Sequence, residues 1–578
     1  MTKRTAQRDA HEVRTVSFVS LGCPKNLVDS EKMLGLLAES GLVPVSYTGR
    51  EMDEHGVERV RDEETERRRD VGGDDFGGAD AVVINTCGFL EASKDESLSV
   101  IREAVKAKRA GTVKRVVVAG CLVQRHRAKM LEWEPGIDAM VGVFDRDRIV
   151  EAVSGGSAVR SNGGTPGAAG APRYWIAGNA LNAAKERGRD TVGLTVHGKD
   201  GKGIGYFEDD SARLRLTPRH YAYLRISEGC NQNCTFCTIP GIRGKMRSKP
   251  ADRVGAEARE LMLDGAFELN LIGQDTTSWG DDIGAGLGGG RDGETQRRRD
   301  GETGGLPMLL RTVTDAVKST TGAGWVRLMY AYPSNFSDPI IDAFAAQCAR
   351  GHLLPYIDMP LQHASDRILA SMRRNVTSEH QRGLIRKLRE RVPGIAVRTT
   401  FISGFPGENE DDHKRLLEFV EESAFEAMGV FEYSREDNTP AGTMEGDPAL
   451  VVPAGVKARR RAELMELQQR IAFRRAADLA GKFDAARPTK SGERFDVLID
   501  APTRTAGKAT TGVGRGGTLY AGRTYFQAPM IDAVTYVQSR EKLAPGELVR
   551  CVIVGSDGYD LTAKPVSEVE SKVTLKVL

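Results

Sequence analysis

Three cysteines lie close together in the run Cys230-Asn231-Gln232-Asn233-Cys234-Thr235-Phe236-Cys237. Thiolates at this CxxxCxxC spacing can bind three irons of a four-iron–four-sulfur (4Fe-4S) cluster and leave the fourth iron without a protein ligand. Structural zinc sites and electron-transfer clusters have four protein ligands instead. An open iron can bind a substrate or cofactor, so the spacing indicates chemistry at the cluster. The alternative is half of a zinc site, but no second cysteine pair follows at zinc-finger spacing.

Three further cysteines, Cys23, Cys87 and Cys121, each follow a short apolar run near the N-terminus. Short apolar runs that alternate with helical patterns predict a parallel α/β sheet. We expect the strands at 16–20, 81–84 and 116–119 and the helices at 29–40 and 92–110. Ligands bind at the carboxyl ends of such strands, so the three cysteines should meet at one edge of the sheet. Taken singly, each thiol is better explained as a buried structural cysteine, but the shared position of the three favours a second cluster.

The middle of the chain repeats the strand–helix pattern six times, which predicts an open or partial (β/α) barrel. The expected strands are 221–226, 269–272, 326–330, 356–359, 397–402 and 428–431. Chemistry in βα barrels takes place at the C-terminal ends of the strands. Cys230 follows the first of these strands, Gln274 and Asp275 follow the second, and Gly404 follows the fifth.

The C-terminal part changes to short strands after an Arg-rich helix at 456–480, which predicts a small β-barrel domain. Three segments interrupt the pattern and are interpreted as insertions without an assigned role: 47–78, 154–213 and 284–305. The expected organisation is a cluster domain at 14–153, a Gly-rich linker at 154–215, a barrel at 216–477 and a β domain at 478–578.

The composition indicates an ordinary globular protein of several domains. The 578 residues carry a net charge of +2, so no overall basic field requires nucleic acid as a partner. Eight cysteines are too few for a disulfide-stapled secreted protein. We find no signal peptide and no apolar stretch long enough to span a membrane, and we expect a cytoplasmic location.

These motifs carry a resemblance to a known family. A CxxxCxxC triplet after the first strand of a partial barrel resembles the radical S-adenosylmethionine (SAM) enzymes. With a three-cysteine domain before it and a TRAM-like β domain after it, the chain resembles the methylthiotransferases. The runs 20–31, with Pro24-Lys25 after Cys23, and 274–276, 360–363 and 404–408 resemble the RimO branch, which modifies ribosomal protein S-twelve. The run 527–532 departs from that branch, which more often has acidic residues there.

The resemblance implies two 4Fe-4S clusters and SAM as cofactors. The cluster ligands would be Cys23, Cys87 and Cys121 for one cluster and Cys230, Cys234 and Cys237 for the other. The resemblance places SAM near Phe236, Gln274, Asp275 and Gly404. Arg398 and Arg373 are candidates to pair with a carboxylate, because a guanidinium offers a bidentate fork. The structural alternatives are that Asp275 caps a turn and that both arginines are ordinary surface charges.

Three residues are weaker candidates. His363 is interpreted as a residue that satisfies the core, and Cys348 and Cys551 as packing residues.

The resemblance also implies a reaction: methylthiolation of the β-carbon of an aspartate in S-twelve, free or in the ribosome, by a transferase that uses a flavodoxin- or ferredoxin-type electron donor. The alternatives are a tRNA adenosine methylthiotransferase, as in the MiaB branch, or a non-catalytic two-cluster electron-transfer protein. The terminal domain from Ser491 has eleven Lys or Arg and ten Asp or Glu, whereas a domain that grips RNA should be strongly basic. This balance favours a protein substrate.

Overall fold

The computed structural model describes residues 13–45, 76–155, 173–178, 195–197, 203–206, 210–287, 304–503 and 517–570. Most of the three expected insertions lies outside these described residues. The chain forms two compact units. The first contains residues 1–216, 227–232 and 238–248, and the second contains residues 217–226, 233–237 and 249–578.

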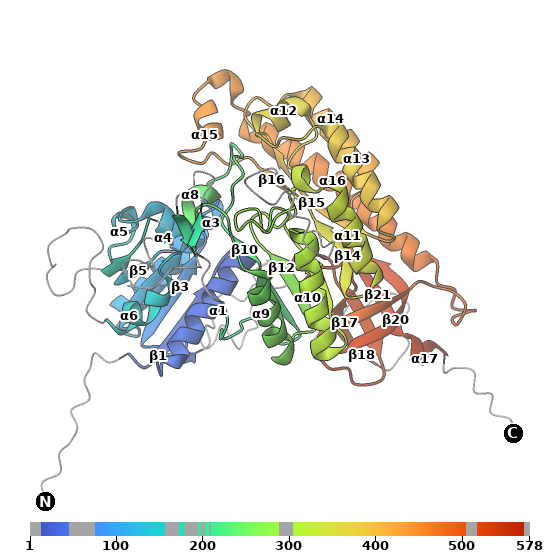
Figure 1. Cartoon of the computed structure of the whole chain (residues 1–578), viewed down its shortest axis with the longest axis horizontal. Coiled ribbons are helices and arrows are strands. Elements are labelled where there is room, and N and C mark those ends of the chain that lie inside the picture. Colours follow the sequence, from blue (N-terminus) through green and yellow to red (C-terminus); the bar gives the residue numbers. More distant parts are fainter. Residues whose placement is uncertain are drawn as a thin grey trace, which may run out of the picture. The chain divides into compact units, whose positions relative to one another are not determined.

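The first unit contains a six-stranded parallel sheet in the order β2-β1-β3-β4-β5-β6. Figure 1 shows its helices in blue to teal, except for α8, which is green. The strands are β1 (Thr15–Ser20), β2 (Val43–Val45), β3 (Ala81–Thr86), β4 (Arg115–Gly120), β5 (Ala139–Val141) and β6 (Arg173–Trp175). The helices are α1 (Pro24–Glu39), α3 (Glu91–Arg109), α4 (Cys121–His126), α5 (Lys129–Trp133), α6 (Ile149–Ser154) and, from the later segment, α8 (Ile239–Arg243).

Both faces of this sheet are covered, which explains the continuous apolar runs of its strands. Val82 and Ile84 of β3 pack in one apolar cluster with Ile101 of α3. Val83 faces the other way and packs in a second cluster that includes Met33 of α1. Helix α1 begins earlier than expected, because Pro24 suits the first turn of a helix.

The second unit contains a six-stranded parallel sheet in the order β16-β15-β14-β13-β12-β9, which confirms the expected partial barrel. Its edge strands β16 and β9 do not pair with each other, so the sheet stays open. The strands are β9 (Tyr221–Arg225), β12 (Glu268–Ile272), β13 (Trp325–Leu328), β14 (Leu353–Asp358), β15 (Ala396–Ser403) and β16 (Ala427–Glu432). Its helices are α9 (Ala251–Leu263), α10 (Leu306–Thr321), α11 (Asp338–Ala349), α12 (Asp366–Ser371), α13 (Ser378–Arg391), α14 (Glu410–Ser423) and α15 (Pro440–Met444).

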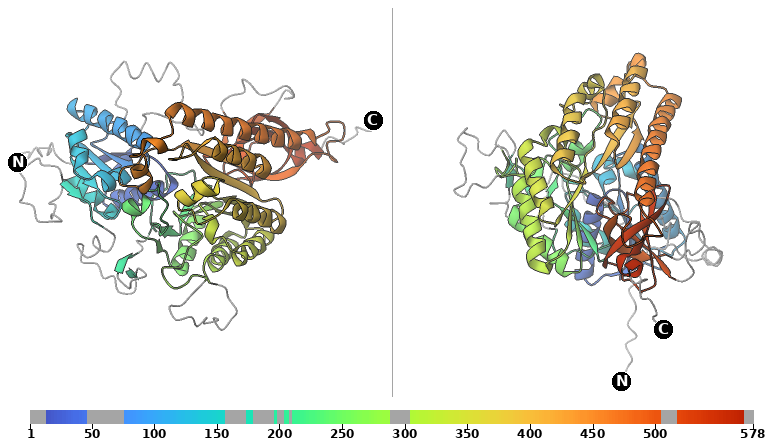
Figure 2. Two further views of the ribbon diagram at one scale, coloured as in Figure 1. Left: turned by 90° about the horizontal axis from the view of Figure 1, so that it is seen from above. Right: turned by 90° about the vertical axis from the view of Figure 1, so that its right-hand side faces the viewer.

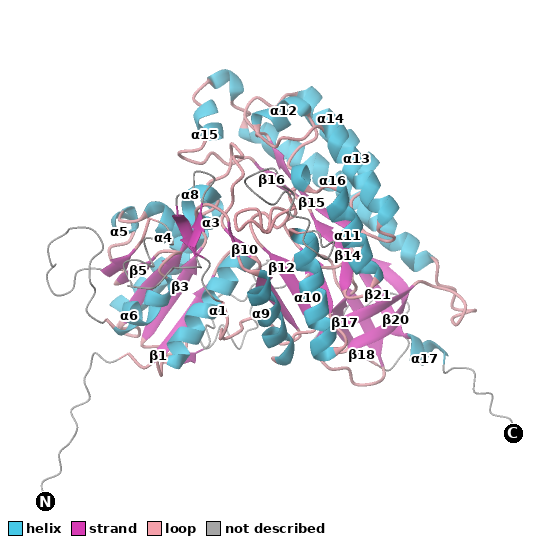
Figure 3. Cartoon of the chain, viewed as in Figure 1, coloured by secondary structure: helices cyan, strands magenta, loops and turns pink. Residues whose placement is uncertain are grey.

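The long helix α16 (Ala454–Gly481) leads from this sheet to the C-terminal β domain. It packs on β16 and also on β20 (Leu548–Asp557) of that domain. The two views of Figure 2 show it in orange, running to the red barrel. The β domain is a closed barrel in the order β17-β18-β19-β21-β20, as the short strands predict. In Figure 3 the barrel is drawn in magenta as strands, whereas cyan helices lie beside the parallel sheet. Its strands are β17 (Arg494–Pro502), β18 (Thr518–Arg523), β19 (Thr535–Ser539), β20 (Leu548–Asp557) and β21 (Asp560–Pro565), and helix α17 (Val566–Glu570) follows.

A buried ionic network fixes the β domain on the sheet of the second unit. Glu268, at the start of β12, accepts hydrogen bonds from Arg327 Nε at 2.7 Å and from Arg523 Nη1 at 2.5 Å. Arg523 also donates to Asp500, which lies 2.7 Å from His220 Nε2. Burial opposes the charge on Glu268, but Arg523 and Arg327 hold its pKa below the ordinary value.

Among the described residues, no helix combines the length and apolar character that a membrane span requires. The remaining short elements complete the described chain. They are the antiparallel pair β7 (Thr195–His197) and β8 (Gly203–Tyr206), the pair β10 (Ser227–Glu228) and β11 (Arg247–Ser248), and three 3₁₀ turns at Arg146–Arg148, Pro333–Asn335 and Pro448–Leu450.

Candidate functional site

The structure places Cys23, Cys87 and Cys121 at the carboxyl ends of three neighbouring strands. Strand β3 lies between β1 and β4 and pairs with both in parallel register. Cys23 caps α1 after β1, Cys87 directly follows β3, and Cys121 begins α4 after β4. The expected convergence on one edge of the sheet is therefore confirmed, and their role as iron ligands stays a prediction.

Two glycines allow the loops that carry these cysteines to approach each other. A Cβ on Gly22 would lie 2.7 Å from Cys87 Cβ and 3.0 Å from Cys87 Sγ. A Cβ on Gly88 would lie 2.7 Å from Leu122 Cα, a backbone atom next to Cys121. The loops that carry the cysteines thus pack closely at Gly22 and Gly88, where there is no space for a side chain.

A buried arginine supplies positive charge to this group of thiols. Arg243 of α8 is 2% exposed and donates from Nη2 to Asp29 Oδ2 at 3.0 Å and from Nη1 to Glu228 Oε2 at 3.0 Å. Burial raises the pKa of Cys121 to about 12, and Arg243 opposes that shift. Burial also raises the pKa of Cys87. These thiols therefore keep their protons until a metal displaces them.

The donor set of this edge fits an iron–sulfur cluster. All eight cysteines are free, and the three at this edge are partly or fully buried. No group of three His, Cys, Asp or Glu in the described part of the chain is arranged around a single metal ion. A 4Fe-4S cluster does not require such a group, because each of its cysteines binds a different iron.

The CxxxCxxC run follows β9, as expected, and each part of it is held by its own unit. In the first unit, the backbone N–H of Cys230 donates to Gly244 O at 3.2 Å. In the second unit, the backbone N–H of Cys237 donates to Cys234 O at 3.1 Å, and Thr235 N–H donates to Met372 O at 3.1 Å. The cysteine backbone is thus fixed by hydrogen bonds.

Phe236 and the loop after β15 meet at one small apolar cluster. Phe236 packs against buried Phe405, Tyr433 and Met372. Gly404, next to Phe405, has φ +73°, and a Cβ there would lie 2.3 Å from Lys457 Cγ. Two of the four residues predicted to line SAM are thereby brought to the same region.

Glu408 holds the Gly404 loop in shape from within. Its Oε2 accepts hydrogen bonds from the backbone N–H groups of Gly404 at 2.7 Å and Phe405 at 3.1 Å, and its Oε1 accepts one from Arg460 at 3.0 Å. His363 Nε2 lies 3.6 Å from Oε2, which agrees with a structural role for this histidine. Burial opposes the charge on Glu408, but His363, Arg460 and the Gly404 amide hold its pKa below the ordinary value.

Gln274 and Asp275 lie just past β12, and Asp275 is 1% exposed. Asp275 accepts hydrogen bonds from the backbone N–H and the hydroxyl of Ser278, at 3.2 and 2.8 Å. The turn-capping role considered for Asp275 is therefore present. Its role toward SAM stays a prediction.

The two arginines predicted to pair with a carboxylate lie in different surroundings. Arg398 lies near the start of β15 rather than at its carboxyl end, and it pairs with Asp358 at 2.9 Å and Asp532 at 3.3 Å. Arg373 is exposed, with φ +54°. The assignment of both arginines to SAM remains a prediction.

Arg374, the neighbour of Arg373, was not predicted from the sequence. Arg374 is 4% exposed and donates from Nη1 to Cys234 Sγ at 3.4 Å. Tyr332, which follows β13, places its hydroxyl 3.5 Å from the same sulfur. No local signal separated the two adjacent arginines, because the end of α12 decides which of them turns inward.

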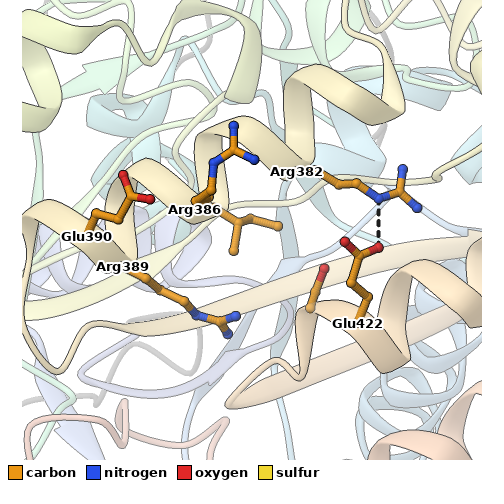
Figure 4. A pocket seen from close by; sticks show the side chains of 7 residues that line it. Arg382, Arg386, Arg389, Glu390 and Glu422 are labelled. Carbon is orange, nitrogen blue, oxygen red and sulfur yellow. Dashed lines mark hydrogen bonds and ion pairs between the residues drawn. The ribbon is translucent and has the colours of Figure 1, made fainter.

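A separate hollow of about 360 Å³ lies on the surface of α13 and α14. Figure 4 shows Arg382, Arg386 and Arg389 along it, with Arg382 paired to Glu422 at 2.8 Å. Glu390 lines it as well, so charges of both signs are present. None of the predicted site residues lines this hollow.

The chain is similar to several known families and proteins. Residues 224–420 match the model of the radical SAM superfamily, residues 492–566 match the TRAM domain, and residues 49–142 match the uncharacterized protein family UPF0004. The chain is 34% identical over 547 residues to "Ribosomal protein uS12 methylthiotransferase RimO" of Lachnoclostridium phytofermentans, covering 94% of this chain and 98% of that protein. It is 36% identical over 550 residues to the RimO of an Anaeromyxobacter species, covering 95% and 92%. A solved radical SAM methyltransferase, TsrM from Kitasatospora setae, aligns with a TM-score of 0.45 at 15% identity, covering 74% of this chain and 77% of that one.

Proposed function

Because the chain belongs to the RimO family of ribosomal protein uS12 methylthiotransferases, we propose that it transfers a methylthio group to the β-carbon of an aspartate of uS12. The observation that carries this proposal is the pair of three-cysteine sets, each just beyond the carboxyl ends of parallel strands. An enzyme that both activates SAM and supplies sulfur needs two such sites. An electron carrier does not need an open iron.

Cys23, Cys87 and Cys121 are the proposed ligands of one cluster, and Cys230, Cys234 and Cys237 those of the other. When bound, the two clusters supply one-electron cleavage of SAM to a 5′-deoxyadenosyl radical and the sulfur that is to be transferred. A radical is required because the β-carbon of an aspartate carries no C–H acidic enough for a general base.

The chain's own residues supply the SAM pocket. Gly404, whose N–H is held by Glu408, has φ +73°, which glycine adopts without strain, so the chain can turn sharply at the end of β15. Phe236 supplies an aromatic surface beside Phe405. Gln274 and Asp275 add polar groups at the end of β12, where Ser278 fixes the carboxylate of Asp275.

Around the first three cysteines, the protein supplies burial and positive charge. Arg243, fixed by Asp29 and Glu228, offsets the negative charge of three thiolates in a place that water reaches poorly. The short backbone contact at Gly88 sets the spacing of Cys87 and Cys121. A flavodoxin- or ferredoxin-type protein is the proposed electron donor.

The test is an anaerobic incubation of the reconstituted protein with dithionite, SAM and purified uS12. We expect uS12 to gain the mass of one methylthio group on an aspartyl peptide, and the Cys234→Ala variant to give none. Radical cleavage of SAM without a uS12 adduct would refute the assignment of the substrate. A methylthiolated adenosine in tRNA incubated in parallel would move the activity to RNA.

A further inference from the structure

Two side chains that no predicted role explains converge on the middle cysteine of the CxxxCxxC run. Arg374 Nη1 lies 3.4 Å and the Tyr332 hydroxyl 3.5 Å from Cys234 Sγ. Arg374 follows α12 and Tyr332 follows β13, so they reach the sulfur from separate elements. A thiolate has no proton to donate, so once Cys234 is a ligand both groups are donors to it.

The guanidinium of Arg374 is held rigidly in this position. Its Nη2 donates to Pro360 O at 2.6 Å, and its central carbon lies 4.1 Å from the centroid of the Tyr332 ring. Arg374 is 4% and Tyr332 is 6% exposed, so water competes weakly for these hydrogen bonds. An arginine that served only to pair with a surface charge would not be stacked and buried in this way.

We propose that Arg374 and Tyr332 are positioning residues that donate hydrogen bonds to the Cys234 thiolate and thereby raise the reduction potential of the SAM-binding cluster. The inference rests on the proposed function, in which Cys234 binds iron. Reduction adds negative charge to a cluster and its sulfurs, so donors and a cation at the sulfur stabilise the reduced state more than the oxidised state. The electron donor can then reduce the cluster more readily.

The experiment is a redox titration, followed by electron paramagnetic resonance, of the full chain without SAM. The parent carries Cys23→Ala, Cys87→Ala and Cys121→Ala, so that only the cluster of the CxxxCxxC run contributes. Arg374→Met should lower the equilibrium constant for reduction about tenfold, which is a shift of the midpoint potential of about −59 mV. Tyr332→Phe should shift the potential in the same direction by less, because it removes a neutral donor.

Two further variants serve as controls. Arg350→Met changes the same residue type in an exposed pair with Asp315 and should leave the potential of the parent unchanged. Arg374→Lys keeps the charge but loses the planar fork, so its potential should lie between those of the parent and Arg374→Met.

The outcomes separate the inference from the proposed function. A parent that contains no cluster after reconstitution refutes the proposed function, since Cys234 would then not bind iron. An intact cluster whose potential is the same in the parent, Arg374→Met and Tyr332→Phe overturns the inference alone, and a weaker SAM affinity in Arg374→Met would then assign the arginine to SAM. If Arg374→Met fails to assemble a cluster, Arg374→Lys and Tyr332→Phe decide by the same criterion.

Discussion

Gly88 offers a sharp test of the geometry around Cys23, Cys87 and Cys121, because it adjoins a proposed ligand without being one. In Gly88→Ala the new Cβ would lie 2.7 Å from Leu122 Cα, 2.8 Å from Leu122 N and 3.0 Å from Cys121 C. Carbon atoms in contact prefer about 3.5 Å or more, so the two loops must separate by roughly 0.8 Å. These are backbone atoms, which cannot rotate away as the end of a side chain can.

The separation moves Cys87 and Cys121 apart, since each is adjacent to one of the clashing residues. Overpacking of this kind costs about 1–3 kcal/mol, which corresponds to a roughly 5- to 150-fold weaker binding of the cluster if the strain is carried at the site. The assay is the iron and sulfide content after reconstitution with limiting iron. Its background is Cys230→Ala, Cys234→Ala, Cys237→Ala, which keeps only this site. We expect Gly88→Ala to lose most of the iron.

The matched control is Gly111→Ala in the same unit. Gly111 has φ +79° and open space around it, so alanine there costs about 1–2 kcal/mol of backbone strain but displaces no cysteine. We expect the thermal stability of this variant to fall while its iron content stays at the parent level. Full iron content in Gly88→Ala, or equal loss in both variants, would refute the reasoning.

Four further predictions concern the second unit. Arg523→Met leaves buried Glu268 with Arg327 as its remaining arginine partner and should lower the free energy of unfolding by about 3–5 kcal/mol. The control Arg550→Met breaks an exposed pair with Asp496 and should lower it by at most about 1 kcal/mol. Denaturant unfolding of the apoprotein measures both variants, and equal losses would contradict the role of burial. The pKa of Glu268 is lowered in the folded state, so its ion pairs should stabilise the fold fully above the ordinary pKa of 4.5. This stabilisation should be lost as the pH falls through the folded pKa. A difference in unfolding free energy between Arg523→Met and the parent that is unchanged at pH 3 would contradict this prediction. Glu408→Gln should weaken SAM binding about tenfold in calorimetry, because an uncharged amide accepts weaker hydrogen bonds from the Gly404 loop. The control Glu410→Gln changes an exposed carboxylate and should leave the affinity for SAM unchanged. If Glu408→Gln binds SAM as tightly as the parent, the loop is not part of the SAM site. Cys348→Ala should leave iron content unchanged, because Cys348 packs in a helix, and a loss of iron would contradict that interpretation.

The sequence by itself determined the order of elements and the positions of the cysteines along them. Apolar runs alternating with helical patterns predicted both parallel sheets, and the short strands after 494 predicted the closed barrel. Cys87 and Cys121 could be placed at strand ends because strand ends are a local property, marked by the switch from an apolar run to a helical pattern. The CxxxCxxC spacing is equally local, and so is the chemistry that it indicates.

Other features were decided only by the tertiary structure. Arg373 and Arg374 are adjacent and chemically identical, and only the turn at the end of α12 directs one to Cys234 and exposes the other. Arg398 pairs with Asp532, which belongs to the β domain far along the chain. Arg243 meets Asp29 although 214 positions separate them in the chain. A sequence pattern reports which face of its own element a residue occupies, whereas such partners depend on how separate elements pack, and that is why they became visible only in the folded protein.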